Sequence, residues 1–352
     1  MGVVNEEICS DGSSDEDEDV EFITIPMKPD WRESENPEEY HRLETETFLK
    51  WKKQLNKLQN KYPNLPPFEK NLDFWRQLWK IVEISHVVVQ VVDARDPLFY
   101  FSHDLSEYVK NISCDTKQNV LLLNKADFLS EEQRRHWAEY FSDSDMKTLF
   151  FSAIESANIE DVSEHPTFNT PEILSPQEVL LAIKELVPAD LVENDMTVIG
   201  FVGYPNVGKS SVINIFMENK CLQVSATPGK TKHYQTHVLQ NGGITLVDGP
   251  GLVIPNLKMD KSEMVLSGIL PIDNLTETTS CIERLIETRL PFNTIVSNYG
   301  IMQSCLSKGF KVRFNCGCQK KSKIENNNIN QYQTLFLLQW KSILFNRTLK
   351  VC

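Results

Sequence analysis

Apolar positions in the first quarter of the chain recur with the period of a helix. In residues 37–62 they lie three and four apart, which predicts an amphipathic helix. The positions that carry this pattern are Phe48, Trp51, Leu55, Leu58 and Tyr62. A second helix is predicted over residues 68–84, since Pro66-Pro67 precede it and proline suits a first helical turn. These helices define an N-terminal helical region, residues 25–84.

From residue 86 the apolar runs become continuous, as in strands that are buried on both faces. Segments with helical character separate these runs, among them residues 131–141, 177–186 and 209–218. Apolar strands that alternate with helices predict a mostly parallel sheet covered on both faces, so we expect a three-layer α/β domain over residues 85–256. The predicted buried strands are residues 87–92, 120–123, 148–151, 197–202 and 244–247.

Polar or biased segments flank and interrupt this domain. Residues 1–24 contain an acidic run and bury too little apolar surface to order, which predicts a disordered acidic tail. Residues 154–177 are polar, contain three prolines and predict a surface connector. Residues 257–300 are expected to form a partial C-terminal helical region, with helices over residues 262–272 and 276–288. Residues 301–352 form a divergent basic tail, for which disorder is one interpretation.

Lysines surround the apolar stripe of the first predicted helix. Two interpretations are open: a helix that packs on the main domain with solvated lysines, or a helix whose basic side meets phosphate. We favour the first, because solvated lysines are the ordinary outcome on a helix surface. The lysines are Lys50, Lys52, Lys53, Lys57 and Lys61.

The chain has 352 residues, a formal net charge of −13 and 41% hydrophobic residues, which is enough for one sizeable core. The acidic balance argues against a protein held to nucleic acid by bulk charge. Residues 1–10 lack the apolar core of a secretory signal, and no apolar run is long enough to span a bilayer. The eight cysteines are therefore expected to be free thiols in a reduced, intracellular protein, and zinc is not expected.

Residues 203–210 match the phosphate-binding pattern G-x-x-x-x-G-K-S. A predicted strand precedes them and a predicted helix follows, which is the context that this motif needs. Its glycines, Gly203 and Gly208, let backbone N–H groups surround phosphates, and the helix N-terminus adds a favourable dipole. Lys209 is expected to reach the β- and γ-phosphates, and Ser210 to ligate Mg²⁺.

A guanine-recognition pattern, N-K-x-D, occurs at residues 124–127, directly after a buried strand. The Asp127 carboxylate can accept hydrogen bonds from guanine N1–H and from its exocyclic amine, which adenine does not offer in that geometry. Asn124 and Lys125 are expected to brace the loop and cover the base plane. Ser152-Ala153, at the end of another strand, is a candidate second guanine contact through backbone N–H groups.

Asp248 and Gly251 fit a D-x-x-G loop that senses the γ-phosphate of GTP. Asp248 is expected to hold Mg²⁺ through water, and the Gly251 N–H to meet the γ-phosphate. Residues 225–233 are the expected place for a mobile switch whose threonine completes the Mg²⁺ shell. We expect that threonine to be Thr231, with Thr227 as second choice.

Leu252 follows Gly251, where a small GTPase usually carries a glutamine that orients the attacking water. Leucine cannot do this, so hydrolysis is slow or another group positions the water. Asn206 resembles the asparagine of potassium-activated GTPases, which helps to hold K⁺ near the β- and γ-phosphates. K⁺ is therefore an additional candidate beside GTP, GDP and Mg²⁺, and the residues expected to act on the reaction are Lys209, Thr231, Gly251 and Asn206.

The order of these motifs is inverted, because the guanine loop precedes the phosphate loop. With the segments at residues 93–97 and 228–231, this order resembles the circularly permuted GTPases of the YlqF/YawG type. The resemblance covers about residues 22–301 and implies a circularly permuted P-loop GTPase domain. Nucleotide contacts would then also include Val207 and Ser211.

Residues 68–79 and 267–273 narrow the resemblance to a branch that acts on the large ribosomal subunit. The resemblance implies GTP hydrolysis in late cytoplasmic maturation of the 60S subunit, coupled to release of its nuclear export adaptor. The implied partners are that adaptor and pre-60S particles, meaning rRNA and ribosomal proteins. Neither membrane insertion nor an oligomer is expected.

Two alternatives stay open from the sequence. Leu252 is compatible with a GTP-sensing scaffold for ribosome assembly that has little intrinsic hydrolysis. The resemblance ends near residue 301, which is compatible with a truncated product whose ribosome function is impaired.

Overall fold

The structure, a computed structural model, describes residues 25–61, 66–113, 116–156, 163, 165–192, 196–217, 234–239, 243–256, 259–271 and 279–288. Three features predicted from the sequence lie outside these ranges: the acidic tail of residues 1–24, the switch with Thr227 and Thr231, and the tail after residue 300. What was expected of them stays a prediction.

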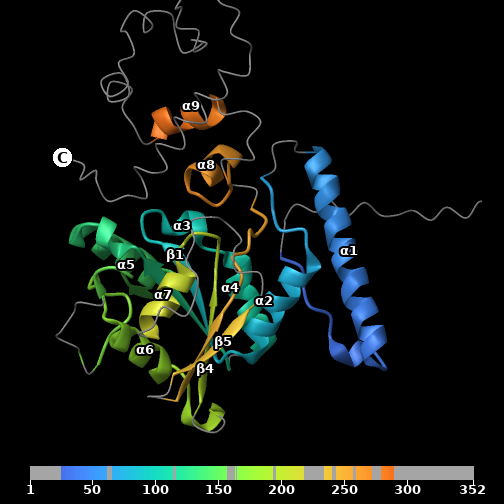
Figure 1. Cartoon of the computed structure of the whole chain (residues 1–352), viewed down its shortest axis with the longest axis horizontal. Helices are drawn as coiled ribbons and strands as arrows, with labels where there is room; N and C mark the ends of the chain where they lie inside the picture. Colours follow the sequence, from blue (N-terminus) through green and yellow to red (C-terminus); the bar gives the residue numbers. More distant parts are fainter. Residues whose placement is uncertain are drawn as a thin grey trace, which may run out of the picture.

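A six-stranded sheet in the order β3-β2-β1-β4-β6-β5 forms the centre of the described part (Figure 1). Neighbouring strands are parallel except at one edge, where β5 pairs antiparallel with β6. All seven residues of β1 are buried, as expected of a strand in the middle of a covered sheet. The predicted α/β class is therefore confirmed. The strands are β1 (Val87–Asp93), β2 (Gln118–Asn124), β3 (Lys147–Phe150), β4 (Thr197–Val202), β5 (Gln235–Leu239) and β6 (Ile244–Asp248).

Helices cover both faces of this sheet. The helices are α1 (Pro37–Lys61), α2 (Leu72–Ile84), α3 (Pro97–Tyr100), α4 (His103–Ser113), α5 (Glu131–Asp143), α6 (Pro176–Glu185), α7 (Lys209–Phe216), α8 (Lys261–Leu266) and α9 (Thr279–Thr288). Successive side chains of a strand point to opposite faces. On β4, Gly200 faces α2, whereas the next residue, Phe201, packs against Phe216 of α7. The two helices therefore lie on opposite faces, and α6 packs beside α7.

The first predicted helix is confirmed by α1, whose buried face includes Phe48, Trp51, Leu55 and Leu58. The start of the second helix was wrong. It begins at Leu72, because the side chain of Asn71 caps it by accepting a hydrogen bond from a backbone N–H of the first turn. Residues 66–70 are not helical and do not form the proline-led first turn that was predicted.

Part of the predicted surface connector packs along the edge of the sheet. Ile173 forms a parallel bridge with Phe150 of β3. Asn169 Oδ1 accepts hydrogen bonds from the backbone N–H and the hydroxyl of Thr148, at 2.8 and 2.7 Å. This half of the predicted connector is thus attached to the edge of the sheet through β3.

The C-terminal helices α8 and α9 pack against each other beyond α3 (Figure 1). Helix α8 ends at Leu266, earlier than the predicted residue 272, because Gly268 adopts the left-handed conformation, with φ 76°. The N–H of Ile269 then bonds to the carbonyl of Met264 at 2.9 Å, which closes the helix end. Within the described residues, no helix combines the length and the apolar character needed to cross a membrane.

Candidate nucleotide-binding site

The predicted motifs meet at one edge of the sheet, where the carboxyl ends of its parallel strands lie. Asn124 ends β2, Asp248 ends β6, and Gly203 directly follows β4. The structure therefore places the guanine loop, the phosphate loop and the γ-phosphate-sensing loop side by side, although they lie far apart in the sequence.

The phosphate loop is shaped by left-handed backbone conformations. Asn206 and Gly208 have φ values of 63° and 101°. Only glycine fits at position 208, since a Cβ atom there would lie 2.3 Å from the Asn124 side-chain nitrogen. The loop can thus curve directly into the N-terminus of α7, as a phosphate cradle requires.

Lys209 is held inside this loop. Its side chain is buried, and its Nζ donates to the carbonyl oxygens of Gly203 and Tyr204, at 3.0 and 2.7 Å. Burial lowers the pKa of Lys209 to about 8, with the Asp248 carboxylate opposing the shift. Phosphate oxygens are stronger acceptors than these carbonyls, so a bound nucleotide can draw the ammonium toward itself.

The donors expected to hold Mg²⁺ lie together beside Lys209. Ser210 Oγ donates to Asp248 Oδ2 at 3.1 Å, and Asp248 is fully buried. Its second oxygen, Oδ1, has no hydrogen-bond partner among the described residues. Burial raises the pKa of Asp248, with Lys209 and the Ser210 hydrogen bond opposing the shift. A hydroxyl beside a carboxylate oxygen that still needs a partner fits a hard cation such as Mg²⁺.

Ser152 has a different part in the guanine loop from the predicted one. Its hydroxyl donates to Asp127 Oδ1 at 2.7 Å, whereas its backbone N–H already donates to Ser156 Oγ at 3.0 Å. The hydroxyl therefore orients the carboxylate that would read guanine, and the N–H is already engaged. Ala153, the other predicted guanine contact, follows as a half-buried residue, and Ser211 is half-buried in the first turn of α7.

Two side chains of the guanine loop bind the backbone of the phosphate loop. Asn124 Nδ2 donates to the carbonyl of Val207 at 2.8 Å, and Lys125 Nζ donates to the carbonyl of Asn206 at 3.0 Å. The Asn124 side chain is buried, and its Oδ1 has no partner within the described part of the chain. These bonds fix the distance between the base-reading and phosphate-binding loops, which form one continuous site.

A buried ion pair at the end of β1 was not predicted to be part of the site. Asp93 accepts hydrogen bonds from Arg95, at 2.9 and 2.6 Å between side chains, and from Lys125 Nζ at 2.8 Å. Burial alone would raise the pKa of Asp93, but the Arg95 hydrogen bonds and the charge of Lys125 hold that pKa well below its ordinary range. The Arg95 guanidinium lies 5.1 Å from the ring centre of Phe128. Asp93 thus positions the lysine expected to cover the base.

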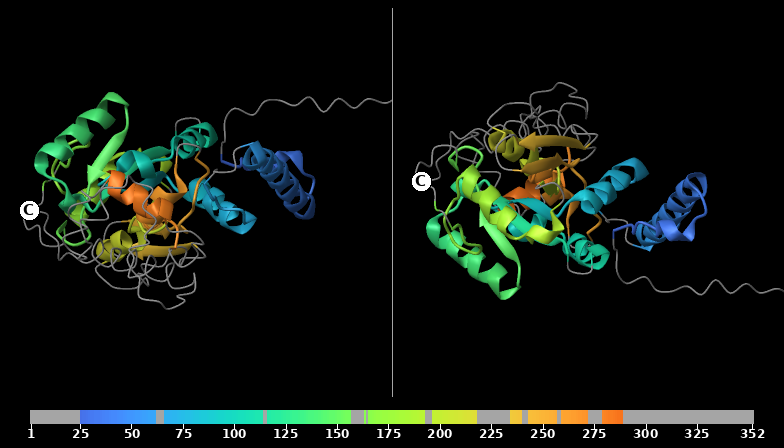
Figure 2. Two further views of the ribbon diagram at one scale, coloured as in Figure 1. Left: turned by 90° about the horizontal axis from the view of Figure 1, so that it is seen from above. Right: turned by 90° about the horizontal axis from the view of Figure 1, so that it is seen from below.

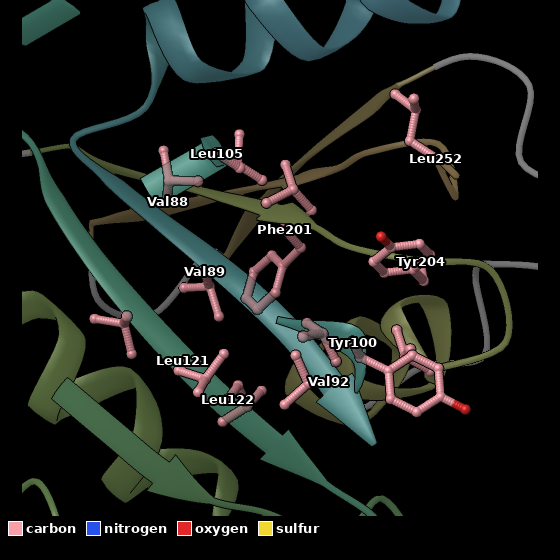
Figure 3. Packing of buried hydrophobic residues seen from close by; sticks show 14 of the residues in the cluster. Val88, Val89, Val92, Tyr100, Leu105, Leu121, Leu122, Phe201, Tyr204 and Leu252 are labelled. Carbon is pink, nitrogen blue, oxygen red and sulfur yellow. The ribbon is translucent and has the colours of Figure 1, made fainter. Parts of the chain in front are cut away.

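The phosphate loop also contacts the turn after α8. Asn206 Nδ2 donates to the carbonyl of Gly268 at 2.6 Å, and the Tyr100 hydroxyl donates to the carbonyl of Ser267 at 3.2 Å. Tyr100 packs edge-on against Tyr204 of the loop, with ring centres 6.1 Å apart (Figure 3). The predicted K⁺ ligand therefore also joins the phosphate loop to the C-terminal helices.

Leu252 points into the protein interior. It is 3% exposed and belongs to the buried apolar cluster, part of which Figure 3 shows. Its neighbour Gly251 lies against the phosphate loop, where a Cβ atom would come within 3.0 Å of Pro205 Cα. Leu252 therefore cannot orient a water at the γ-phosphate position, and Thr231 lies outside the described residues.

Comparison with known proteins relates this site to ribosome-associated GTPases. Residues 198–286 match a family described as 50S ribosome-binding GTPase. Large subunit GTPase 1 homolog of Drosophila melanogaster is 39% identical over 339 residues, covering 81% of this chain and 55% of that protein. Large subunit GTPase 1 of Schizosaccharomyces pombe is 38% identical over 320 residues, covering 85% of this chain and 52% of that protein. The chain thus spans about half the length of the curated relatives that it matches.

Among solved structures, GNP-bound YlqF from T. maritima aligns with a TM-score of 0.41 and 22% identity, covering 75% of this chain and 91% of that one. The fold assignment therefore depends on the strand order and motif positions described above rather than on this match.

We predict that Asp127→Asn shifts nucleotide preference from GTP toward xanthosine triphosphate. The carboxylate offers two acceptors, whereas the amide offers one acceptor and one donor. The amide donor would face a guanine donor, so the lost hydrogen bond costs about 1.5–3 kcal/mol. Competition binding of the two nucleotides measures the change. Ser152→Ala is the control, because it removes the group that orients Asp127 and should weaken GTP binding without exchanging the preferred base. Retained GTP preference in Asp127→Asn would contradict the assignment.

We also predict that Asp93→Asn destabilises the domain by about 3 kcal/mol, the lower end for a broken buried pair, because its cationic partners are partly exposed. The loss arises since Arg95 and Lys125 are left close together without the anion between them. The pKa of Asp93 is lower in the folded protein than in the unfolded chain, so its carboxylate stabilises the fold at pH values above the unfolded pKa. The difference in free energy of unfolding between wild type and Asp93→Asn should therefore shrink as pH falls below about 4.

Urea unfolding checks the Asp93→Asn prediction, with Asp143→Asn as the control. Asp143 is exposed at the end of α5, and its replacement changes the net charge equally, with an expected effect within about 0.5 kcal/mol. Equal losses in both variants would show that net charge rather than the ion pair is responsible.

Proposed function

The chain contains a circularly permuted P-loop GTPase domain related to the large subunit GTPase 1 proteins, and on this premise we propose that it hydrolyses GTP as a switch in assembly of the large ribosomal subunit. The single observation that carries the proposal is the pair of hydrogen bonds from Asn124 and Lys125 to the phosphate loop. They bring a guanine-reading carboxylate and a phosphate cradle into one site, which fits a guanine nucleotide and rejects an adenine nucleotide.

The residues of this site divide the work on GTP. Asp127, oriented by its hydrogen bond from Ser152, selects the base. Lys125, positioned by its hydrogen bond to Asp93, covers the base plane. Lys209, now bonded to the loop carbonyls, would turn to the phosphates, and Ser210 and Asp248 would hold Mg²⁺. The metal would supply positive charge against the phosphate oxygens. Thr231 is proposed as the third Mg²⁺ residue, as the sequence pattern indicates.

The finer proposal is a role in late cytoplasmic maturation of the 60S subunit and in release of its nuclear export adaptor. The printed names of the relatives, which refer to the large subunit, support the ribosomal part. The resemblance over residues 22–301 supports the stage and the adaptor. The burial of Leu252 adds a constraint: some other group must orient the attacking water. We propose that the ribosomal particle supplies it.

A second candidate function is a GTP-sensing scaffold with little turnover. The burial of Leu252 favours it, because a buried leucine cannot orient the attacking water. The two candidates differ in whether the large subunit accelerates hydrolysis, since a scaffold needs binding alone.

We expect purified large subunits to raise single-turnover GTP hydrolysis by about tenfold or more, since one added transition-state contact lowers the barrier by about 1.4 kcal/mol. Lys209→Ala should abolish nucleotide binding or turnover, because it removes the cation from the cradle. Lys184→Ala, which alters an exposed lysine of α6, should behave as wild type. Tight GTP binding without any stimulation would favour the scaffold.

If Asn206 holds K⁺, single-turnover hydrolysis should be faster in K⁺ than in Na⁺ buffer, and Asn206→Ala should remove the difference. Tyr100→Phe is the control, because it removes the other hydrogen bond to the turn after α8 and leaves Asn206 intact. The control should keep the K⁺ preference of the wild type. Equal wild-type rates in the two buffers would exclude a K⁺ role.

A further inference from the structure

The charge of α1 changes sharply along its length. Its first half carries four acidic residues and one arginine, Arg42, which pairs with Glu46 at 3.5 Å. From residue 50 to the helix end at residue 61, five lysines occur without a single acidic residue, in a chain with a net charge of −13. An exposed helix that needs only solubility can mix charges of both signs along its whole length, so a run of cations without acidic residues calls for another reason.

Four of these lysines share one face of the helix. Lys50, Lys53, Lys57 and Lys61 follow each other at spacings of three, four and four, and all are exposed. At 100° per residue they lie opposite the buried side chains Phe48, Trp51, Leu55 and Leu58. We call these four residues the lysine stripe. It runs for about 16 Å along the helix axis.

Within the described part of the chain, the position of α1 leaves the stripe exposed to solvent. In Figure 1 and in both views of Figure 2, α1 lies at the margin of the described molecule, away from the sheet. Its apolar side turns inward, where Trp51 packs edge-on against Trp75 of α2 with ring centres 5.4 Å apart. The opposite side, with the stripe, therefore faces outward.

The helix dipole does not explain the stripe. Cations are favoured near a helix C-terminus, but the effect fades within the last turn. It accounts for Lys61, at the end of α1, and not for Lys50 or Lys53, which lie two to three turns earlier. Helix α1 also lies apart from α7, at whose N-terminus the phosphate loop ends (Figure 1), and none of the stripe lysines is among the site residues described above.

We propose that the lysine stripe binds the sugar-phosphate backbone of helical RNA. This inference rests on the proposed ribosomal role for its choice of RNA as the partner. Evenly spaced cations match a polyanion, whose affinity comes from counterion release. Lysine is depleted in protein–protein interfaces, which argues against a protein partner. A membrane surface would need the apolar side of α1, which is already buried in the protein.

The stripe also distinguishes between forms of RNA. Single strands are bound by aromatic side chains on which bases stack, and the stripe itself consists of lysines alone. Lysines on a straight helix can instead follow the phosphates of a double helix, whose recognition depends on shape and backbone. The expected contact is therefore independent of base sequence.

The test uses the full chain and a fluorescent RNA duplex of about 20 base pairs, with affinity measured by anisotropy at several salt concentrations. Replacement of all four stripe lysines by Gln, a residue of similar helix propensity, should reduce the slope of log Kd against log salt by about 3–4. The control replaces four exposed lysines elsewhere, Lys80, Lys110, Lys184 and Lys261, by Gln and should keep the wild-type slope. GTP affinity should be unchanged in both variants, which verifies that they fold.

Three outcomes would overturn the inference: equal loss in both variants, no loss in either, or displacement of RNA by a polyglutamate peptide at comparable charge concentration. The last would assign the stripe to an acidic protein segment. Stimulation of GTP hydrolysis by large subunits is measured separately. If the stripe variant loses salt slope but large subunits do not stimulate hydrolysis, the proposed function is rejected and the stripe is kept. If large subunits stimulate hydrolysis but the stripe variant keeps the wild-type slope, the stripe alone is rejected.

Discussion

The hydrogen bonds from the guanine loop to the phosphate-loop backbone are the constraint on which the site depends. Asn124 and Lys125 lie at the end of β2, whereas Asn206 and Val207 lie in the loop after β4. The Asn124 side chain nevertheless donates directly to the Val207 carbonyl, and the Lys125 side chain to the Asn206 carbonyl. Because a nucleotide has a fixed length, base reading and phosphate binding act together only if these loops keep a constant distance. The pairing of β1 with both β2 and β4 sets that distance, and the two hydrogen bonds hold it.

Buried charged groups are paired differently in the guanine loop and in the phosphate loop. On the base side, Asp93 accepts hydrogen bonds from both Arg95 and Lys125, so each cation has an anionic partner before any ligand arrives. On the phosphate side, Lys209 donates to two backbone carbonyls, and one oxygen of Asp248 has no hydrogen-bond partner among the described residues. The base side is thus preorganised, whereas the phosphate side awaits a ligand that brings an anion and a cation together.

Patterns of neighbouring residues were enough to predict the strands and the loops that follow them. Continuous apolar runs located the buried strands, and motif spacing located the loops at their carboxyl ends. What the sequence did not predict depends on contacts between distant residues. The start of α2 follows from a cap at Asn71 rather than from the prolines before it. Three contacts join segments that only the folded sheet brings together. They are the hydrogen bonds from Ser152 to Asp127, from Lys125 to Asp93 and from Asn206 to Gly268.

The permuted order of the sheet also has a consequence for synthesis of the chain. Strand β1 lies in the interior of the sheet between β2 and β4, yet it is made long before β4. Domains form from the N-terminus as a chain emerges, so β1, β2 and β3 can pair while one edge of β1 still has no neighbour. Such an edge, mostly apolar and buried along its whole length in the folded protein, can join with foreign strands. It gains its second neighbour only when residues 197–202 have left the translating ribosome.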